Sequence, residues 1–283
     1  MNNKIIENKQ FSRERDLYGQ KDIVLRHCLF DGVEDGESAL KEGENIEIYD
    51  TTFALRYPLW HGKHLEIYNS QFLETARAAI WYSNDILISN TLLHGVKALR
   101  ECHDISLKNV DIVSNEFGWK CFNFKSEDIS LKSEYAFFES DNINLKNFKF
   151  DGKYSFQYTK NVVIENSILH TKDCFWHCEN AIIKNCIIKG EYLAWYAKNL
   201  TFINCQISGT QPFCYCDNLK LIDCTMEGCD LAFEYSEVYA KINSRMKSIK
   251  NPRAGRIEVL GVDEIILSED SKYPTHAEIV TDK

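Results

Sequence analysis

Histidine, tyrosine, glutamate and lysine side chains recur along the chain at intervals that are mostly 19 residues. The recurring positions are His61, Tyr82, Glu101, Lys125, Glu139, Tyr158, His177, Tyr196, Tyr215 and Glu234. Carboxylates and lysines can act as general acids and bases. Aromatic rings can cover the C–H faces of sugars while their polar ends meet hydroxyl groups. We therefore predict a catalytic group of Glu101, Lys125 and Glu139, and a saccharide-binding group of the other residues together with Asp173.

An internal repeat indicates the elements that would position these side chains. Residues 161–166, 180–185, 199–204 and 218–223 share one pattern: polar, apolar, any, apolar, any, then Asn or Asp. The first polar position recurs with spacings of 23, 19, 21, 19, 24 and 14 residues, then repeatedly 19, at Asp22, Asn45, His64, Asp85, Asp104, Asp128, Asn142, Asn161, Asn180, Asn199, Asn218 and Glu237. About thirteen coils predict one domain, with an N-terminal cap over residues 1–20, coils over 21–267 and a C-terminal cap over 268–283.

Within each coil the apolar residues alternate with period two, and the stretches are too short for helices. This pattern predicts an all-β, single-stranded right-handed parallel β-helix, in which each strand pairs with its equivalent about 4.8 Å away in the next coil. A left-handed helix would need a strict hexapeptide period, and a leucine-rich repeat would need a different Asn spacing. A second polar position can form an asparagine ladder at the corners, at Asp50, Asn69, Asn90, Asn109, Ser133, Asn147, Asn166, Asn185, Asn204 and Asp223.

Several longer stretches carry a family resemblance. They are GESALKE (36–42), YPLW (57–60), ARAAIWY (76–82), KDCFWH (172–177), GEYLAW (190–195), QPFCY (211–215), LAFEYS (231–236) and KNP (250–252). The chain resembles a bacterial β-helix family that is catalogued only as a domain of unknown function within the pectate-lyase-like superfamily. The resemblance implies the right-handed β-helix and no particular reaction.

Each coil is expected to contain three strands, and the third is rich in aromatic residues on both faces. Strand alternation would place its second and fourth residues on one side. Because Lys and Glu are rarely buried unpaired, we expect this side to face solvent, and the tryptophans Trp60, Trp81, Trp176 and Trp195 to face inward. The outward set then includes apolar residues, among them Leu59, Ile80, Phe137, Phe156, Phe175 and Phe213. The opposite orientation, with the tryptophans outside, is the alternative.

The resulting aromatic stripe has three interpretations: a saccharide platform, a subunit interface, or a surface covered by a loop or terminal segment. Extra residues fall in 31–43, near 74–78 and in 114–119, all beside the stripe. The short coil that starts at Asp128 predicts a notch next to them. Long loops beside a notch are typical of a cleft.

Glu101 and Glu139 should flank this notch two rungs apart, at roughly 9.6 Å. That separation suits the acid and base of an inverting glycosidase. Lys125, expected between them, can instead form an ordinary ladder of salt bridges with both. A lyase would need a basic residue near a neutralised uronate, for which Lys97, Arg77 and Arg100 are the candidates.

Composition limits the remaining choices. The net charge is −9, which argues against nucleic acid as a partner. No apolar run approaches the roughly 20 residues of a membrane span, and the N-terminus has no apolar signal segment, so we expect a cytoplasmic protein that binds no membrane. Its eleven cysteines are expected to be reduced and to fill core space, as in the column Cys186, Cys205 and Cys224. We expect no metal or other cofactor. The alternative to an oligosaccharide-binding protein is a scaffold that self-associates or binds a protein through the stripe.

Overall fold

The computed structural model describes residues 3–33 and 36–281. All their regular elements are β-strands, which form the predicted right-handed parallel β-solenoid with a spacing of about 19 residues. It has about 15 turns, against the thirteen or so coils expected from the sequence. The chain divides into two compact units, Met1–Asn144 (unit 1) and Leu145–Lys283 (unit 2), which are described separately. In the described ranges no helix has the length and apolar character needed to cross a bilayer.

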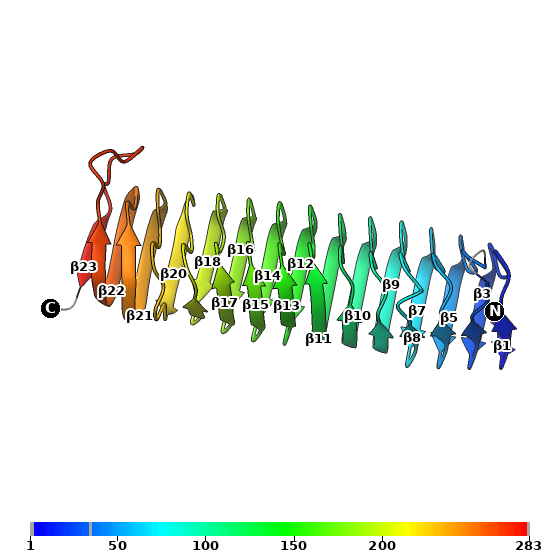
Figure 1. Ribbon diagram of the computed structural model, residues 1–283. Coiled ribbons are helices and arrows are strands. Elements are labelled where there is room, and N and C mark those ends of the chain that lie inside the picture. The colour runs from blue at the N-terminus through cyan, green and yellow to red at the C-terminus, as the bar shows by residue number, and fades with distance from the viewer. Residues whose placement is uncertain (1–2, 34–35, 282–283) are drawn as a thin grey trace. The chain divides into compact units, whose positions relative to one another are not determined.

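Unit 1 is built from parallel strands in which each strand pairs with its equivalent in the next coil (Figure 1). Its strands are β1 (Lys4–Glu7), β2 (Gln10–Phe11), β3 (Lys21–Arg26), β4 (Leu29–Phe30), β5 (Glu44–Tyr49), β6 (Thr52–Phe53), β7 (Lys63–Tyr68), β8 (Gln71–Phe72), β9 (Asn84–Leu93), β10 (His103–Val113) and β11 (Phe122–Glu134). Because the register is direct, identical inward positions stack, as in Ile67 beside Ile88.

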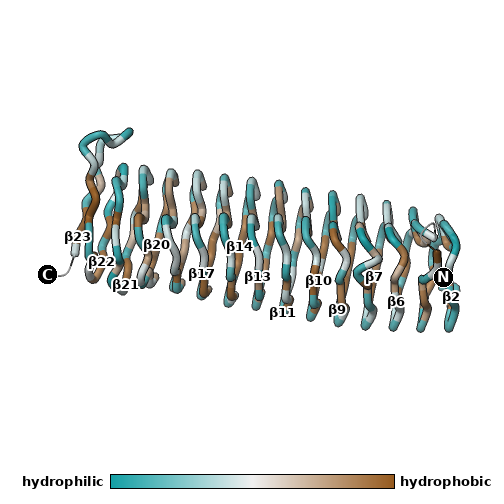
Figure 2. The backbone as a smooth tube through the Cα atoms, viewed as in Figure 1, coloured by the Kyte–Doolittle hydropathy of each residue, from teal (hydrophilic) through white to brown (hydrophobic). Residues whose placement is uncertain are grey.

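Unit 2 repeats this arrangement. Its strands are β13 (Lys149–Lys153), β14 (Lys160–Glu165), β15 (Ile168–Lys172), β16 (Glu179–Lys184), β17 (Ile187–Glu191), β18 (Lys198–Ile203), β19 (Gln206–Ser208), β20 (Leu219–Cys224), β21 (Glu237–Lys250), β22 (Ala254–Ile266) and β23 (Glu278–Thr281), while β12 (Asp141–Lys146) contains the boundary between the units. Hydrophobic and hydrophilic stretches alternate along each coil (Figure 2). The inward residues, such as Ile164, Ile183 and Phe202, are fully buried and form the core.

Two of the corners in most coils are turned by residues with positive φ, mostly Asn and Asp. Asn tolerates this left-handed conformation, and its side chain can bond its equivalent one coil away. In unit 2 the Nδ2 of Asn204 donates to Oδ1 of Asn185 at 2.9 Å, and Asn185 donates to Asn166 at 3.2 Å. The predicted asparagine ladder is therefore confirmed. A second ladder runs along the other corner, where Asn218 donates to Asn199 at 2.9 Å.

The predicted short coil does not exist. Asn123 lies 19 residues after Asp104 and donates to its carboxylate at 2.7 Å, and Asn142 lies 19 residues after Asn123 and donates to it in turn. Asn123, not Asp128, therefore occupies the first corner. Asp128 takes the second corner, 19 residues after Asn109, in the place assigned to Ser133. The coils here are regular, so the structure has no notch and no extra residues in 114–119.

The predicted third strand is a turn segment of six residues, such as 173–178 and 192–197. In residues 154–159 the backbone φ is positive at every second residue, namely Tyr154, Phe156 and Tyr158. This breaks the strand alternation on which the predicted orientation rested, and two consecutive side chains face the core. The apolar residues expected outside, such as Phe156 and Phe175, are therefore fully buried, and the tryptophans expected inside are half-buried.

The coils also begin and end beyond the expected bounds. β1 pairs with β3 in direct register, so residues 4–7 belong to a coil and not to a cap. At the other end β23 pairs with residues 256–259 of β22. The last coil thus reaches into the segment predicted as the C-terminal cap.

All eleven cysteines are free and buried. Cys186, Cys205 and Cys224 occupy the same position in consecutive coils, where their thiols donate to the carbonyls of Ile164, Ile183 and Phe202 at 3.7, 3.4 and 3.5 Å, which confirms the predicted column. Burial raises the pKa of Cys174, Cys178 and Cys214 to about 12. These thiols pack as small apolar side chains and carry almost no thiolate at neutral pH.

We expect Gly209→Ala to lower the free energy of unfolding by about 3 kcal/mol. Gly209 has φ +137°, and a Cβ there would lie 1.7 Å from the carbonyl oxygen of Gly190. Gly228 is the matched control, because it has φ +72° and open space around a Cβ, so that Gly228→Ala should cost only about 1 kcal/mol. Urea unfolding measures both, and equal losses would contradict the close coil contact at Gly209.

The native protein should resist thiol labelling. A thiol-specific reagent at pH 7 is expected to modify the cysteines only as fast as the protein opens, because the thiols are buried. In denaturant all eleven should react at once. Rapid labelling of the native protein, followed by mass spectrometry, would show that a thiol is accessible.

Candidate functional site

The turn segments of unit 2 present a column of neighbouring rings, which we call the tyrosine column: Tyr158, His177, Tyr196, Tyr215 and Tyr235. Neighbouring ring centroids lie 4.8 Å apart for Tyr158 and His177, 5.0 Å for His177 and Tyr196, and 4.6 Å for Tyr196 and Tyr215. The planes of these pairs are within 12° of parallel. The structure thus brings together four residues of the predicted binding group, in consecutive coils.

Stacking decides which part of each ring meets solvent. The ring spacing is close to the roughly 4.8 Å between coils, so the faces of the inner rings are covered by their neighbours. The expectation that flat ring faces would cover sugar rings is therefore wrong for the inner members. The outer edges remain accessible: Tyr158 and Tyr196 are 49% and 40% exposed. The column offers phenol hydroxyls and imidazole nitrogens at intervals of one coil.

These polar groups are available to a ligand. In the described part of the chain, the hydroxyls of Tyr196 and Tyr215 and the ring nitrogens of His177 have no protein hydrogen-bond partner. Burial raises the pKa of Tyr215, and the neighbouring Tyr196 adds a smaller increase. Its hydroxyl therefore stays protonated at neutral pH and can donate as well as accept.

A row of half-buried side chains lies beside the tyrosine column. Trp176 and Trp195 stack with centroids 5.4 Å apart, and their Nε1 atoms donate to the carbonyls of Tyr192 and Gln211 at 2.8 Å. Trp195 also contacts Tyr192 edge-on at 5.6 Å and Tyr215 at 5.9 Å. The row joins the tyrosine column to the first position of each turn segment, where Tyr192 lies.

Asp173 occupies that first position one coil earlier. It is 8% exposed, and no protein group in the described residues donates a hydrogen bond to its carboxylate. Burial raises its pKa, while Lys172 lowers it and Glu191 raises it. Lys172 itself is directed at Glu191, with Nζ to Oε2 at 3.1 Å, and lies over the ring of Tyr192 at 5.3 Å. Asp173 is therefore a recessed carboxylate without a partner.

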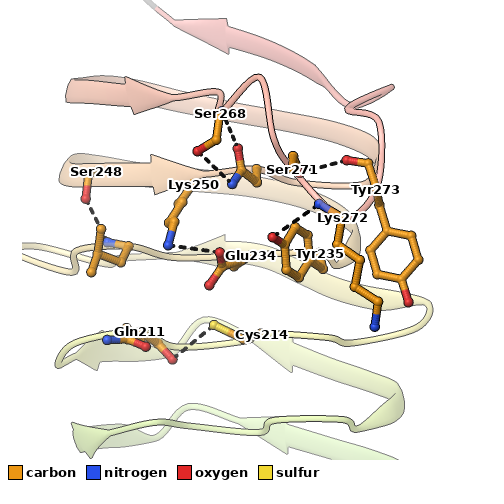
Figure 3. Close-up of polar contacts among 12 residues, drawn as sticks. Gln211, Cys214, Glu234, Tyr235, Ser248, Lys250, Ser268, Ser271, Lys272 and Tyr273 are labelled. Carbon is orange, nitrogen blue, oxygen red and sulfur yellow. Dashed lines mark hydrogen bonds and ion pairs between the residues drawn. The ribbon is translucent and has the colours of Figure 1, made fainter.

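At the C-terminal end of the tyrosine column the residue predicted to bind substrate is displaced. Glu234 is half-buried and pairs with Lys250 at 2.9 Å (Figure 3). The next residue, Tyr235, follows Tyr215 in the column, with ring centroids 5.4 Å apart and ring planes tilted by 59°. Residues 226–229 carry one extra residue, which shifts the register. Tyr235 in turn contacts Tyr273 at 5.4 Å and receives a long hydrogen bond from the backbone of Lys272.

Unit 1 carries a mixed column at the same position of its turn segments: His61, Tyr82, Glu101, Lys120 and Glu139. His61 stacks on Tyr82 at 4.9 Å. Lys120, which lies 19 residues after Glu101, occupies the place predicted for Lys125, and its Nζ is 3.5 Å from Oε2 of Glu139. That pair is an exposed salt bridge. The catalytic role assigned to Glu101 and Glu139 stays a prediction.

Lys125 was misplaced because the coil boundaries were misread. It lies in β11 opposite Ser106 of β10, on the strand that follows the corner, and not between Glu101 and Glu139. The 19-residue spacing alone was sufficient to find Lys120. The placement of Arg100 could not be found from the spacing in this way. Its guanidinium lies 4.6 Å from the rings of both Trp81 and Trp119 and donates a hydrogen bond to Glu116 at 2.7 Å.

The two lengthened coils of unit 1 do form a cleft. Its volume is about 340 Å³, and it is lined by Asp31, Gly32, Ala54, Leu55, Arg56, Thr75 and Arg77. Nε of Arg56 pairs with Glu37 at 2.7 Å. Residues 34 and 35 of the first predicted loop lie outside the described residues. Among the described residues, His, Cys, Asp and Glu form no group of three that could hold a metal ion.

We expect Asp173→Asn to increase stability at pH 7. Because burial raises the pKa of Asp173, the ionised form destabilises the native state above that pKa, and the penalty is absent below the ordinary value of about 3.9. The thermal melting temperature of Asp173→Asn should therefore exceed that of the parent at pH 7, and the difference should vanish toward pH 3.

Asp151→Asn, at an exposed position of β13, is the matched control and should leave the melting temperature unchanged. A melting temperature of Asp173→Asn below that of the parent at pH 7 would mean that the carboxylate has a stabilising partner.

Three solved structures match the chain at low similarity. They are HetL, a pentapeptide repeat protein from Nostoc (12% identity, TM-score 0.28, covering 78% of this chain and 91% of that chain), the A-module of the mannuronan C-5 epimerase AlgE4 from Azotobacter vinelandii (7%, 0.34, 98% and 88%), and PfbA, a surface adhesin of Streptococcus pneumoniae (12%, 0.33, 97% and 79%). These values are too low to carry an argument about function.

None of the curated proteins compared with the chain matches it. A family model does match, and it covers residues 4–280, which is nearly the whole sequence. The chain therefore belongs to the family described as "Protein of unknown function (DUF3737)".

Proposed function

We propose that unit 2 binds a carbohydrate chain along its tyrosine column, with the sugar chain running parallel to the stack of coils. The observation that carries this proposal is the stack from Tyr158 to Tyr215, because it repeats one outward polar group per coil. A ligand that matches it must carry hydrogen-bonding groups at a similar, regular spacing. An oligosaccharide provides hydroxyl groups on each sugar unit.

The chemistry of the surface supports this class of ligand. The hydroxyls of Tyr196 and Tyr215 can each donate and accept, as sugar hydroxyls do. The half-buried Trp176 and Trp195 beside them are fixed by hydrogen bonds to the backbone, so little side-chain entropy is lost on binding. The net charge of −9 disfavours a polyanion such as nucleic acid.

Tyr196→Phe and Tyr215→Phe test the proposal, because they remove the hydroxyls and keep the rings that stack. Each lost hydrogen bond is worth about 0.5–1.5 kcal/mol, so each variant should weaken oligosaccharide binding roughly twofold to tenfold. Isothermal titration against a panel of neutral oligosaccharides measures Kd. The matched control is Tyr239→Phe, at a tyrosine of unit 2 that is 49% exposed and lies on β21 outside the column.

If a protein that carries both Tyr196→Phe and Tyr215→Phe binds the oligosaccharide with unchanged affinity, the ligand binds elsewhere. If no oligosaccharide binds and the parent protein is an oligomer that Tyr196→Ala with Tyr215→Ala converts to a monomer in light scattering, the column is a subunit interface. That result would replace the carbohydrate proposal.

A further inference from the structure

We propose that Asp173 selects the ligand of the tyrosine column, accepting hydrogen bonds from a neutral sugar and excluding sugars that carry a carboxylate. This inference rests on the proposed function and adds the class of sugar. The observation behind it is that Asp173 is a recessed residue with an exposed fraction of 8%, and that no protein group in the described residues donates a hydrogen bond to its carboxylate.

A recessed carboxylate without partners is costly to keep. Removing it from water loses hydration, and buried charges are normally paired or hydrogen-bonded. Here a cation is next to it in the sequence, yet Lys172 is directed at Glu191 and Tyr192 instead. The carboxylate oxygens are therefore left for donors that come from outside the protein.

Asp173 begins the turn segment 173–178, which also carries His177 of the tyrosine column. The side chain of Gln157 donates to the carbonyl of Asp173 at 3.2 Å, and Gln157 is the residue next to Tyr158 of the column. One coil later, Trp195 bridges Tyr192 and Tyr215 through ring contacts of 5.6 and 5.9 Å. The first position of the turn segment and the tyrosine column thus belong to one continuous surface.

The charges around Asp173 determine which donors are accepted. Lys172 carries +1, and Asp173 and Glu191 each carry −1, so the local sum is −1. A carboxylate has about four acceptor sites and can hold two neighbouring sugar hydroxyls at once. A uronate would bring a second negative charge against it, which is unfavourable at hydrogen-bonding distance.

The test compares a neutral oligosaccharide that binds with its uronic-acid counterpart of the same linkage, by isothermal titration at pH 7. The parent should bind the neutral sugar at least tenfold more tightly than the uronate. Asp173→Asn should reduce that ratio to about twofold, mainly by weakening the neutral sugar and admitting the uronate. Glu227→Gln, which removes an exposed carboxylate outside the surface, should leave the ratio unchanged.

Two failures can be told apart. If neither sugar binds the parent, the proposed function fails. If the neutral sugar binds and Asp173→Asn changes neither the affinity nor the ratio, the column binds carbohydrate and the role of Asp173 is wrong. A reduced ratio in Glu227→Gln as well would mean that the overall negative charge, and not Asp173, excludes the uronate.

Discussion

Direct register between neighbouring coils is the constraint on which the rest of this structure depends. Each strand pairs with its equivalent at a spacing of about 4.8 Å, so every side chain lies beside the residue at the same position one coil away. Inward positions must therefore hold residues that stack with their own kind, as in the series Phe30, Phe53 and Phe72. Corner positions must hold residues that tolerate positive φ, which explains the Asn ladders.

The same constraint produces the candidate site. A ring at one turn position is brought to within about 5 Å of the ring in the next coil, so a column of aromatic residues must stack. Stacking covers the faces of the rings and leaves their edges exposed. The surface therefore offers hydrogen-bonding groups to a ligand in place of apolar ring faces. Tyr196, held between His177 and Tyr215, shows the effect most clearly. Asp173 lies at a position where its neighbours in adjacent coils are Tyr154 and Tyr192, neither of which pairs with its carboxylate.

The tight packing also explains why the coils differ from one another in length and in residue size at only a few positions. Gly190 and Gly209 lie against the backbone of the preceding coil, where no Cβ fits. In the described part of unit 1, the lengthened coils contribute Asp31, Gly32, Thr75 and Arg77 to the cleft that also contains Arg56. The buried cysteines fit the same small positions as serine and threonine in other coils.

The sequence by itself determined the parallel β-solenoid, its coil spacing of about 19 residues, the asparagine ladder and the cysteine column, because each depends only on residues that recur at a fixed interval. It also indicated that Tyr158, His177, Tyr196 and Tyr215 form one column. Only the tertiary structure decided the orientation of the turn segments, since their alternating positive φ values break the period-two rule for strands. The assignment of Lys120 and Tyr235 to their columns likewise depended on the backbone pairing. A single misassigned corner or inserted residue shifts the assignment of every later residue. The tertiary structure also decided that the Asp173 carboxylate has no protein partner in the described residues, because sequence spacing does not show that Lys172 pairs with Glu191.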